Sequence, residues 1–250
     1  MVKPLMGGYT GEEVGHLSEM SNVTEFAKRL AQLKSDLVTQ GDRVTDMLLR
    51  SVECFFDQDQ DKAQTVIEAD SVIDRVDVEI ERASIPLLAM GITDEHQIRS
   101  VLMIVKINNE LERIADCSVN IAEVVAGDES SNYSNSIPQT FRVMANSVVG
   151  MLRDATRSLG NLDRNLAEQV LGFDDTVDRF KQEIVRDAQN KVASGTLSAN
   201  IAFELLSVAK ALERIADHCT NICEQVIYSE SGMVVRHLPG GWSKPAQPSN

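Results

Sequence analysis

The sequence predicts an all-α protein built from two tandem, structurally similar three-helix bundles, with six long antiparallel helices in total. Three observations predict this fold: apolar residues recur at helical spacing, aromatic residues make up only 4% of the chain, and one six-residue segment occurs twice. Strands favour aromatic and β-branched side chains, whereas the frequent Ala, Leu, Glu, Gln, Arg and Met favour helices. Hydrophobic residues make up 43% of the 250 residues, which is enough for a substantial core.

The first bundle is expected at residues 21–127, after a glycine-containing lead-in at 1–20 that we expect to be flexible. Its first helix should begin near the start of that range and end at an acidic turn signal, DQDQD, at 57–61. A second helix should follow to about Met90. The third should begin at about Glu95, where acidic residues favour the first turn of a helix.

The second bundle is expected at residues 138–237. The segment before it, at 128–137, is rich in Ser and Asn and is the clearest linker in the chain. Three helices are expected in this half, at about 138–159, 162–193 and 198–228. The closing segment 238–250 contains three prolines and two glycines, and we expect it to be disordered.

An internal repeat supports the two-bundle organisation. The segment LERIAD occurs at 111–116 and again at 212–217, an offset of 101 residues. Ten of the fifteen positions are identical when 111–125 is compared with 212–226. Upstream acidic pairs repeat at an offset of 104 instead, so we expect the second half to have lost three residues in its last interhelix turn.

Acidic residues four apart recur in both halves and lie on one helix face. The four pairs are Asp70 and Asp74, Glu112 and Asp116, Asp174 and Asp178, and Glu213 and Asp217. Such pairs repel each other by a few tenths of a kcal/mol, and cations that prefer oxygen ligands would relieve the repulsion. This spacing fits Mg, Ca, Mn or Fe. The alternative is a solvated acidic face whose carboxylates are held by Arg75, Arg113, Arg179 and Arg214.

Composition excludes several classes of function. The formal net charge of −14 disfavours nucleic acid and anionic membrane surfaces as partners, because both are themselves negative. No apolar run approaches the length of a membrane span, and the cytoplasm with reduced thiols is the expected location. We find no Walker A, GxGxxG or GxSxG motif. Cys219 and Cys223, beside His218, could share a soft metal, but two small core residues are the preferred interpretation.

The paired segments LERIADCSVNIAE and LERIADHCTNICEQVIY, each preceded by an Asp-x-x-x-Asp helix, resemble the signatures of the PhoU family, as does QVIYSESGMVVRH. The resemblance covers residues 21–237. It implies metal-binding Glu/Asp-x-x-x-Asp motifs, which hold multinuclear iron or zinc clusters in some members. By motif position, the eight carboxylates above become the ligands. The first copy has Cys117 where the second has His218, so the two sites could differ in ligands or occupancy.

The resemblance also implies a function. It implies a cytoplasmic negative regulator of phosphate uptake and phosphate-starvation signalling, connecting the ATPase subunit of a phosphate ABC transporter to a membrane sensor histidine kinase. Such a protein would be an adaptor and not an enzyme, and would approach the membrane only through its partners; a homodimer remains open. Two other classes are retained: a metal-dependent enzyme or metal store using the same carboxylates, and a purely structural helical spacer.

Overall fold

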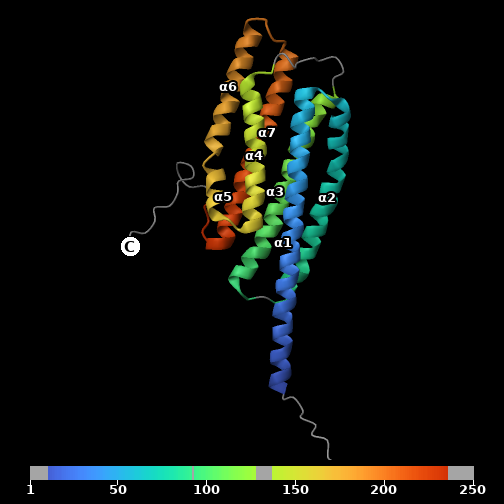
Figure 1. Ribbon diagram of the computed structural model, residues 1–250, viewed down its shortest axis with the longest axis vertical. Coiled ribbons are helices and arrows are strands. Elements are labelled where there is room, and N and C mark those ends of the chain that lie inside the picture. Colours follow the sequence, from blue (N-terminus) through green and yellow to red (C-terminus); the bar gives the residue numbers. More distant parts are fainter. Residues whose placement is uncertain (1–10, 92, 128–136, 236–250) are drawn as a thin grey trace, which may run out of the picture.

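The computed structural model describes residues 11–91, 93–127 and 137–235, with side chains from residue 22 onward. Every regular element in these ranges is an α-helix, which confirms the predicted all-α class (Figure 1). The helices are α1 (Gly11–Asp57), α2 (Gln60–Ala89), α3 (Glu95–Ala126), α4 (Gln139–Asn161), α5 (Arg164–Leu171), α6 (Asp174–Ala193) and α7 (Ala199–Ser231). None of the helices described combines the length and apolar character that crossing a bilayer requires.

The fifth predicted helix is broken into the short α5 and the longer α6. A two-residue turn at 172–173 separates them, and the Gly172 N–H donates to the Glu168 carbonyl oxygen at 3.1 Å. Helix α6 restarts at Asp174, whose carboxylate lies near the partial positive charge of the helix N-terminus. One glycine in a helical pattern does not by itself predict a break, and residues 68–69, at the same repeat position, are helical.

Helix α1 begins at Gly11, about ten residues before the predicted start. Residues 11–20, assigned from sequence to a flexible lead-in, are therefore helical, and that assignment is wrong for them. Isolated glycines weaken a helix without ending it, and no proline occurs within α1. The remaining lead-in at 1–10, most of the linker at 128–137 and the whole tail at 238–250 lie outside the described residues.

The turns of the two halves match at an offset of 104 residues. Gln58 and Leu162 end α1 and α4 and are the non-glycine residues with positive φ in the described part of the chain, at 55° and 50°. The next residues, Asp59 and Asp163, cap α2 and α5 by accepting a hydrogen bond from the backbone N–H three residues later. The two halves therefore share the same chain path through this turn.

The three-residue difference between the halves lies elsewhere than predicted. The last connection of each half has five residues, at 90–94 and 194–198. The LERIAD segment begins 16 residues after the start of α3 but only 13 residues after the start of α7, counted from Glu95 to Leu111 and from Ala199 to Leu212. The loss is therefore within the first turns of α7 and not in the turn.

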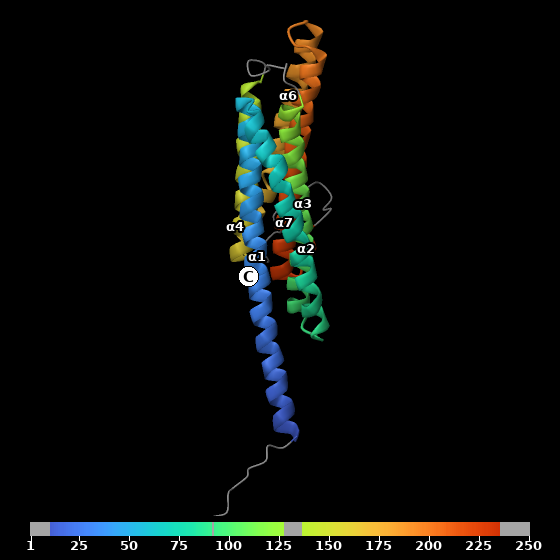
Figure 2. The ribbon, with the colours of Figure 1, turned by 90° about the vertical axis from the view of Figure 1, so that its right-hand side faces the viewer.

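Helices α3 and α7 lie side by side where the two halves meet, and α1 lies beside α4 (Figures 1 and 2). Lys106 contacts Tyr228 and Glu110 contacts His218, so α3 and α7 run antiparallel. The apolar faces of the helices enclose a continuous core of buried side chains. This packing turns the acidic faces of α3 and α7 away from the core.

Close packing of α1 on α4 depends on Gly41. A Cβ atom at this position would lie 2.7 Å from Cγ2 of Thr156, which is closer than ordinary van der Waals contact. At the same repeat position in α4, the buried residue is Ala145, which carries a methyl group. The absence of a side chain at Gly41 thus sets how closely the two halves approach along α1 and α4.

Candidate functional site

Four of the eight predicted ligands lie along the boundary between α2 and α3. Asn108 on α3 fixes the register of these helices, because its Nδ2 donates to Oδ1 of Asp77 at 2.6 Å and to the Asp77 carbonyl oxygen at 2.9 Å. Asp77 thereby joins the predicted carboxylates. We call this group the first cluster; its members are Asp70, Asp74, Asp77, Glu112 and Asp116.

Burial and mutual repulsion act together on the first cluster. Burial raises the pKa of Asp70, and the neighbouring carboxylates of Asp74 and Asp116 raise it further. Burial likewise raises the pKa of Glu112, with Asp116 as the next cause. The structure therefore brings carboxylates from both helices within electrostatic range of one another.

Arg113 neutralises part of the first cluster. Its Nε lies 3.4 Å from Oε2 of Glu112, and its Nη1 lies 3.5 Å from Oδ2 of Asp116. These distances exceed those of strong charge-assisted hydrogen bonds. Oε2 of Glu112 is buried and accepts no hydrogen bond within the described part of the chain. This carboxylate oxygen thus has the long ion pair with Arg113 but lacks the hydrogen bond that buried polar atoms normally have.

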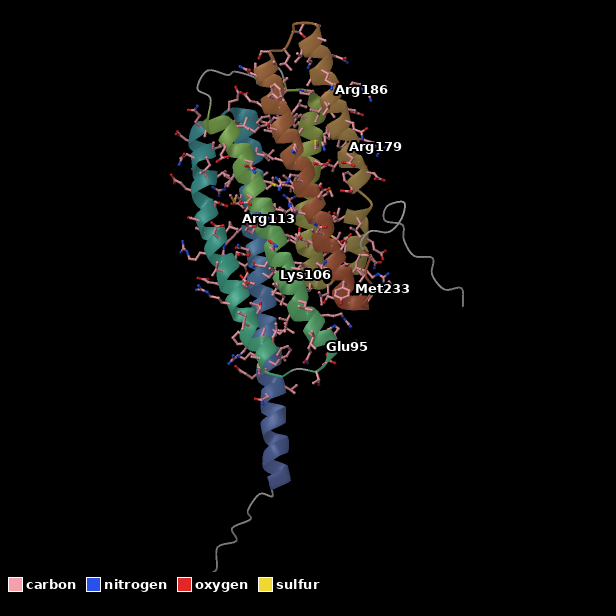
Figure 3. The ribbon with its side chains drawn as sticks, turned by 180° about the vertical axis from the view of Figure 1, so that it is seen from behind. Glu95, Lys106, Arg113, Arg179, Arg186 and Met233 are labelled. Atoms are coloured by element: carbon pink, nitrogen blue, oxygen red, sulfur yellow. The ribbon has the colours of Figure 1, made fainter. Side chains whose placement is uncertain are left out.

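The other three arginines of the solvated-face interpretation do not hold carboxylates. Among the described residues, Arg75, Arg179 and Arg214 make no ion pair, and Nη2 of Arg179 donates to Oγ1 of Thr176 at 2.9 Å. Figure 3 shows Arg113 on α3 and Arg179 on α6, viewed from the side on which α3 and α7 lie together. The alternative interpretation therefore accounts for Arg113 alone.

The remaining four predicted ligands form a second cluster between α6 and α7. Its members are Asp174, Asp178, Glu213 and Asp217. Burial, followed by repulsion from the other three carboxylates of the cluster, raises the pKa of Asp217 to about 6. Burial and the Asp178 carboxylate are the main causes that raise the pKa of Asp174. Each half therefore brings its two acidic motifs, one from each helix, to the same helix boundary.

Sequence reasoning missed two residues that distinguish the clusters. Lys181 occupies the repeat position of Asp77, 104 residues later, and its Nζ lies 2.7 Å from Oε1 of Glu213. The first cluster thus gains a carboxylate at the position where the second gains an ammonium group. The sequence did contain a signal for Asp77. Residue 77 lies three positions after Asp74, which places it on the helix face that carries Asp70 and Asp74.

A polar contact across α3 and α7 lies between the clusters. Oε2 of Glu110 lies 2.7 Å from Nδ1 of His218 and accepts a hydrogen bond from Nδ2 of Asn221 at 3.0 Å. Burial acts to raise the pKa of Glu110, but the hydrogen bonds from His218 and Asn221 outweigh it and lower that pKa. His218 therefore joins the two halves, whereas Cys117 at the same repeat position is buried in the core.

The cysteine pair on α7 is part of the core. Cys219 and Cys223 are fully buried, and burial raises the pKa of both thiols, to about 12 for Cys223. Thiolates are the form of cysteine that binds metals, and these environments disfavour it. The arrangement supports the preferred interpretation of the pair as small packing residues.

The donor set of both clusters fits a hard or borderline cation. All the predicted ligands are carboxylates, which suit Mg²⁺, Ca²⁺, Mn²⁺ and iron, and Glu112 supplies a buried oxygen without a hydrogen-bond partner. Within the described ranges, no three or more His, Cys, Asp or Glu side chains gather closely enough to form a ready-made site. A cation would therefore have to draw the carboxylates of a cluster together.

Comparison with known proteins agrees with the repeated architecture. The family model of the PhoU domain matches the chain twice, at residues 37–125 and 141–226. The PhoU structure from Pseudomonas aeruginosa superposes with a TM-score of 0.76 at 26% identity, covering 83% of this chain and all of that one. The PhoU structure from Streptococcus pneumoniae gives a TM-score of 0.77 at 23% identity, covering 84% of this chain and 99% of that one, and supports the fold alone.

Two relatives extend the likeness at the level of sequence. The phosphate-specific transport system accessory protein PhoU homolog 1 of Thermotoga maritima is 31% identical over 222 residues, covering 89% of this chain and 96% of that protein. The accessory protein PhoU of Escherichia coli is 27% identical over 216 residues, covering 86% and 89%. Because both halves match and the relatives are covered almost end to end, this chain belongs to the PhoU family.

Proposed function

We propose that this chain is a cytoplasmic regulatory adaptor that represses phosphate uptake and phosphate-starvation signalling. Its proposed partners are the ATPase subunit of a phosphate ABC transporter and a membrane sensor histidine kinase. The observation that carries the proposal is the double PhoU-domain match, with relatives that are named as accessory proteins of phosphate-specific transport systems. Those names describe accessory proteins and not enzymes, which supports an adaptor.

A helical adaptor would change the output of a kinase by binding one of its states more tightly than the other. A fifty-fold change in that equilibrium requires about 2.3 kcal/mol of differential binding, which a single modest interface can supply. The two clusters present negative charge beside α3 and α7, so they suit a basic surface on a partner. Association at this face should weaken as salt concentration rises.

We further propose that each cluster binds a cation, with iron or zinc first and Mn, Mg or Ca also compatible. A bound cation would supply positive charge that offsets the repulsion among the carboxylates. Asp70, Asp74, Glu112 and Asp116 would hold it in the first half, and Asp174, Asp178, Glu213 and Asp217 in the second. Protein purified without chelator should contain metal, measurable by elemental analysis.

A deletion strain tests the regulatory role directly. Without the protein, a reporter of a phosphate-starvation promoter should stay active in phosphate-rich medium, and the wild-type gene should restore repression. A pull-down from phosphate-rich cells should recover the transporter ATPase and the kinase in amounts that fall with salt. Normal repression in the deletion strain would contradict the adaptor proposal. Catalytic turnover, or iron uptake far beyond a few ions per chain, would favour the enzyme or storage alternative instead.

A further inference from the structure

An exposed apolar side chain stands at the same repeat position of α3 and α7. Leu102 and Phe203 each lie nine residues before the LERIAD segment of their helix. They are 40% and 71% exposed, whereas the other large apolar residues of these two helices are buried or half-buried. Single exposed apolar residues are common on protein surfaces, but this one recurs in both repeats.

A second exposed apolar residue lies on the neighbouring helix of each half. Leu88 and Val192 match at the offset of 104 residues, are the next-to-last residues of α2 and α6, and are 45% and 38% exposed. We call Leu88 with Leu102 the first apolar pair, and Val192 with Phe203 the second apolar pair. Each pair has one member on each helix of its half.

Helix register places the members of a pair on the same stretch of the helix boundary. In the first half α2 packs along α3, and Asp77 contacts Asn108. Leu88 lies eleven residues after Asp77, and Leu102 lies six residues before Asn108. Because the helices are antiparallel, both apolar residues lie between that contact and the turn that joins α2 to α3.

The second half repeats this placement. Nζ of Lys181 on α6 lies 2.7 Å from Oε1 of Glu213 on α7, which fixes the register of these two helices. Val192 lies eleven residues after Lys181, and Phe203 lies ten residues before Glu213. Both apolar residues therefore lie between the Lys181 contact and the turn that joins α6 to α7.

One spacing relates the apolar pairs to the acidic clusters. Each apolar residue stands 14 residues from the second aspartate of the acidic pair on its own helix: Leu88 from Asp74, Leu102 from Asp116, Val192 from Asp178 and Phe203 from Asp217. Fourteen residues span about 21 Å along a helix and end only about 40° from the starting direction. Each half thus presents an acidic cluster and an apolar pair on one surface, which we call the first face and the second face.

The charge and length of the faces indicate what covers them. The first cluster holds five carboxylates beside Arg113, and the second holds four beside Lys181, so both faces attract a basic partner. A helix laid along a face rises 1.5 Å per residue, so about 14 of its residues span the distance from apolar pair to cluster. The net charge of −14 disfavours a second copy of this chain or an anionic bilayer at the same place.

We propose that each face binds one basic amphipathic helix of a partner protein. Bulky apolar side chains of that helix cover the apolar pair, and its Arg or Lys residues, about 14 positions away, meet the acidic cluster. Since α2 meets α3 at the lower end of the first half and α6 meets α7 at the upper end of the second, one chain holds two such helices in opposite directions (Figures 1 and 2). This inference rests on the proposed adaptor role and adds the docking surface, the chemistry of the bound segment and the stoichiometry.

The first experiment uses the full-length protein and a fluorescein-labelled, stapled helical peptide. The peptide carries leucines near one end and arginines about 14 residues away, and a control peptide of the same composition carries the arginines about four residues from the leucines. Fluorescence anisotropy and titration calorimetry should show two spaced peptides bound per chain, at least about tenfold more tightly than the control peptide. No binding of the spaced peptide, or equal binding of both peptides, would overturn the inference.

Paired substitutions then assign the two bound peptides. Leu88→Ser with Leu102→Ser should weaken one of the two binding events by about tenfold or more, and Val192→Ser with Phe203→Ser should weaken the other. All four residues are exposed, and circular dichroism establishes that each variant is folded. Binding that neither double variant weakens would contradict docking on these faces.

A matched control removes two apolar residues of similar exposure from other surfaces. Val72 and Val143 are 42% and 44% exposed; Val72 lines a hollow between α1 and α2, and Val143 lies on α4. Val72→Ser with Val143→Ser should leave the binding of the spaced peptide unchanged. A loss equal to that of the other double variants would show that the peptide responds to exposed apolar surface in general and would overturn the inference.

A reporter of a phosphate-starvation promoter separates this inference from the adaptor role. In the deletion strain the wild-type gene should restore repression, whereas a gene with all four serine substitutions should not, at equal protein levels. Repression by both genes would overturn the docking faces and leave the adaptor role intact, while failure of the wild-type gene would refute the adaptor role itself. A wild-type dimer in light scattering that the four substitutions convert to monomers would assign the faces to a second copy and overturn the proposed occupant.

Discussion

The two halves of the molecule share the turn after their first helix and a continuous core, but they differ in the charges along their outer helix faces. Gln58 and Leu162 adopt the same left-handed conformation, and the aspartates that follow them cap their helices in the same way. Along the outer faces, Asp77 and Lys181 stand at one repeat position with opposite charge. A duplicated backbone therefore constrains buried and turn residues strongly, whereas a partly exposed position can reverse its charge without changing the path of the chain.

The largest expected effect tests the packing of one half on the other. Gly41→Ala should lower the free energy of unfolding by about 1–3 kcal/mol, because the new methyl group would overlap the Thr156 side chain. Chemical denaturation followed by circular dichroism measures the change. The double variant Gly41→Ala with Thr156→Ala should recover most of the loss. A Gly41→Ala variant more stable than wild type would show that helix propensity outweighs this close approach.

The next effect tests the polar contact between the halves. Glu110→Ala should lower the free energy of unfolding by about 1–2 kcal/mol, because Nδ1 of His218 and Nδ2 of Asn221 lose the carboxylate that both contact. The corresponding residue in the second half is Ala211, so the substitution makes the two halves alike at this position. Urea unfolding should shift to a lower midpoint. An unchanged midpoint would mean that water replaces the Glu110 carboxylate without any loss of the free energy of unfolding.

The repeat and the helical period were sufficient to predict the fold and to place the two carboxylates of each i,i+4 pair on one helix face. Residues four apart share a helix face whatever the tertiary packing, so Asp70 and Asp74 could be placed together from the sequence. The contact of Glu110 with His218 could not, because 108 residues separate them and only the register of α3 against α7 brings them together. The proximity of Lys181 to Glu213 depends in the same way on the packing of α6 against α7.

A smaller effect tests the break that distinguishes the second half. Gly172 has φ of −70°, and a Cβ there would meet its nearest atoms at 3.6 Å, so alanine fits without strain. Gly172→Ala should raise the free energy of unfolding by about 0.4–1 kcal/mol, chiefly by restricting the unfolded chain. Thermal unfolding measures the change. Gly91→Ala, at a φ of 73°, is the opposite control and should be destabilising.

The smallest effect compares the charges of the two clusters. Because the folded pKa of Asp217 is raised to about 6 from the ordinary 3.8, the folded state holds this proton more tightly than the unfolded state does. The protonated Asp217 carboxyl therefore makes its full contribution to the free energy of unfolding below about pH 4, and that contribution is lost as the pH rises through 6. Neighbouring helices cover only part of the Asp217 side chain, so water screens the repulsion and at pH 7 the ionised group opposes folding by a few tenths of a kcal/mol.

Asp217→Asn should accordingly raise the melting temperature at pH 7 by about 1–2 °C, with the difference from wild type vanishing near pH 4. The matched variant is Asp116→Asn, which stands at the same LERIAD position but removes a carboxylate that lies 3.5 Å from Arg113. We expect the melting temperature of that variant at pH 7 to equal that of the wild type, because the loss of the ion pair with Arg113 offsets the relief of repulsion among the carboxylates. Calorimetric melting curves at pH 4, 5, 6 and 7 distinguish the two, and equal gains for both variants would show that Arg113 leaves the first cluster as repulsive as the second.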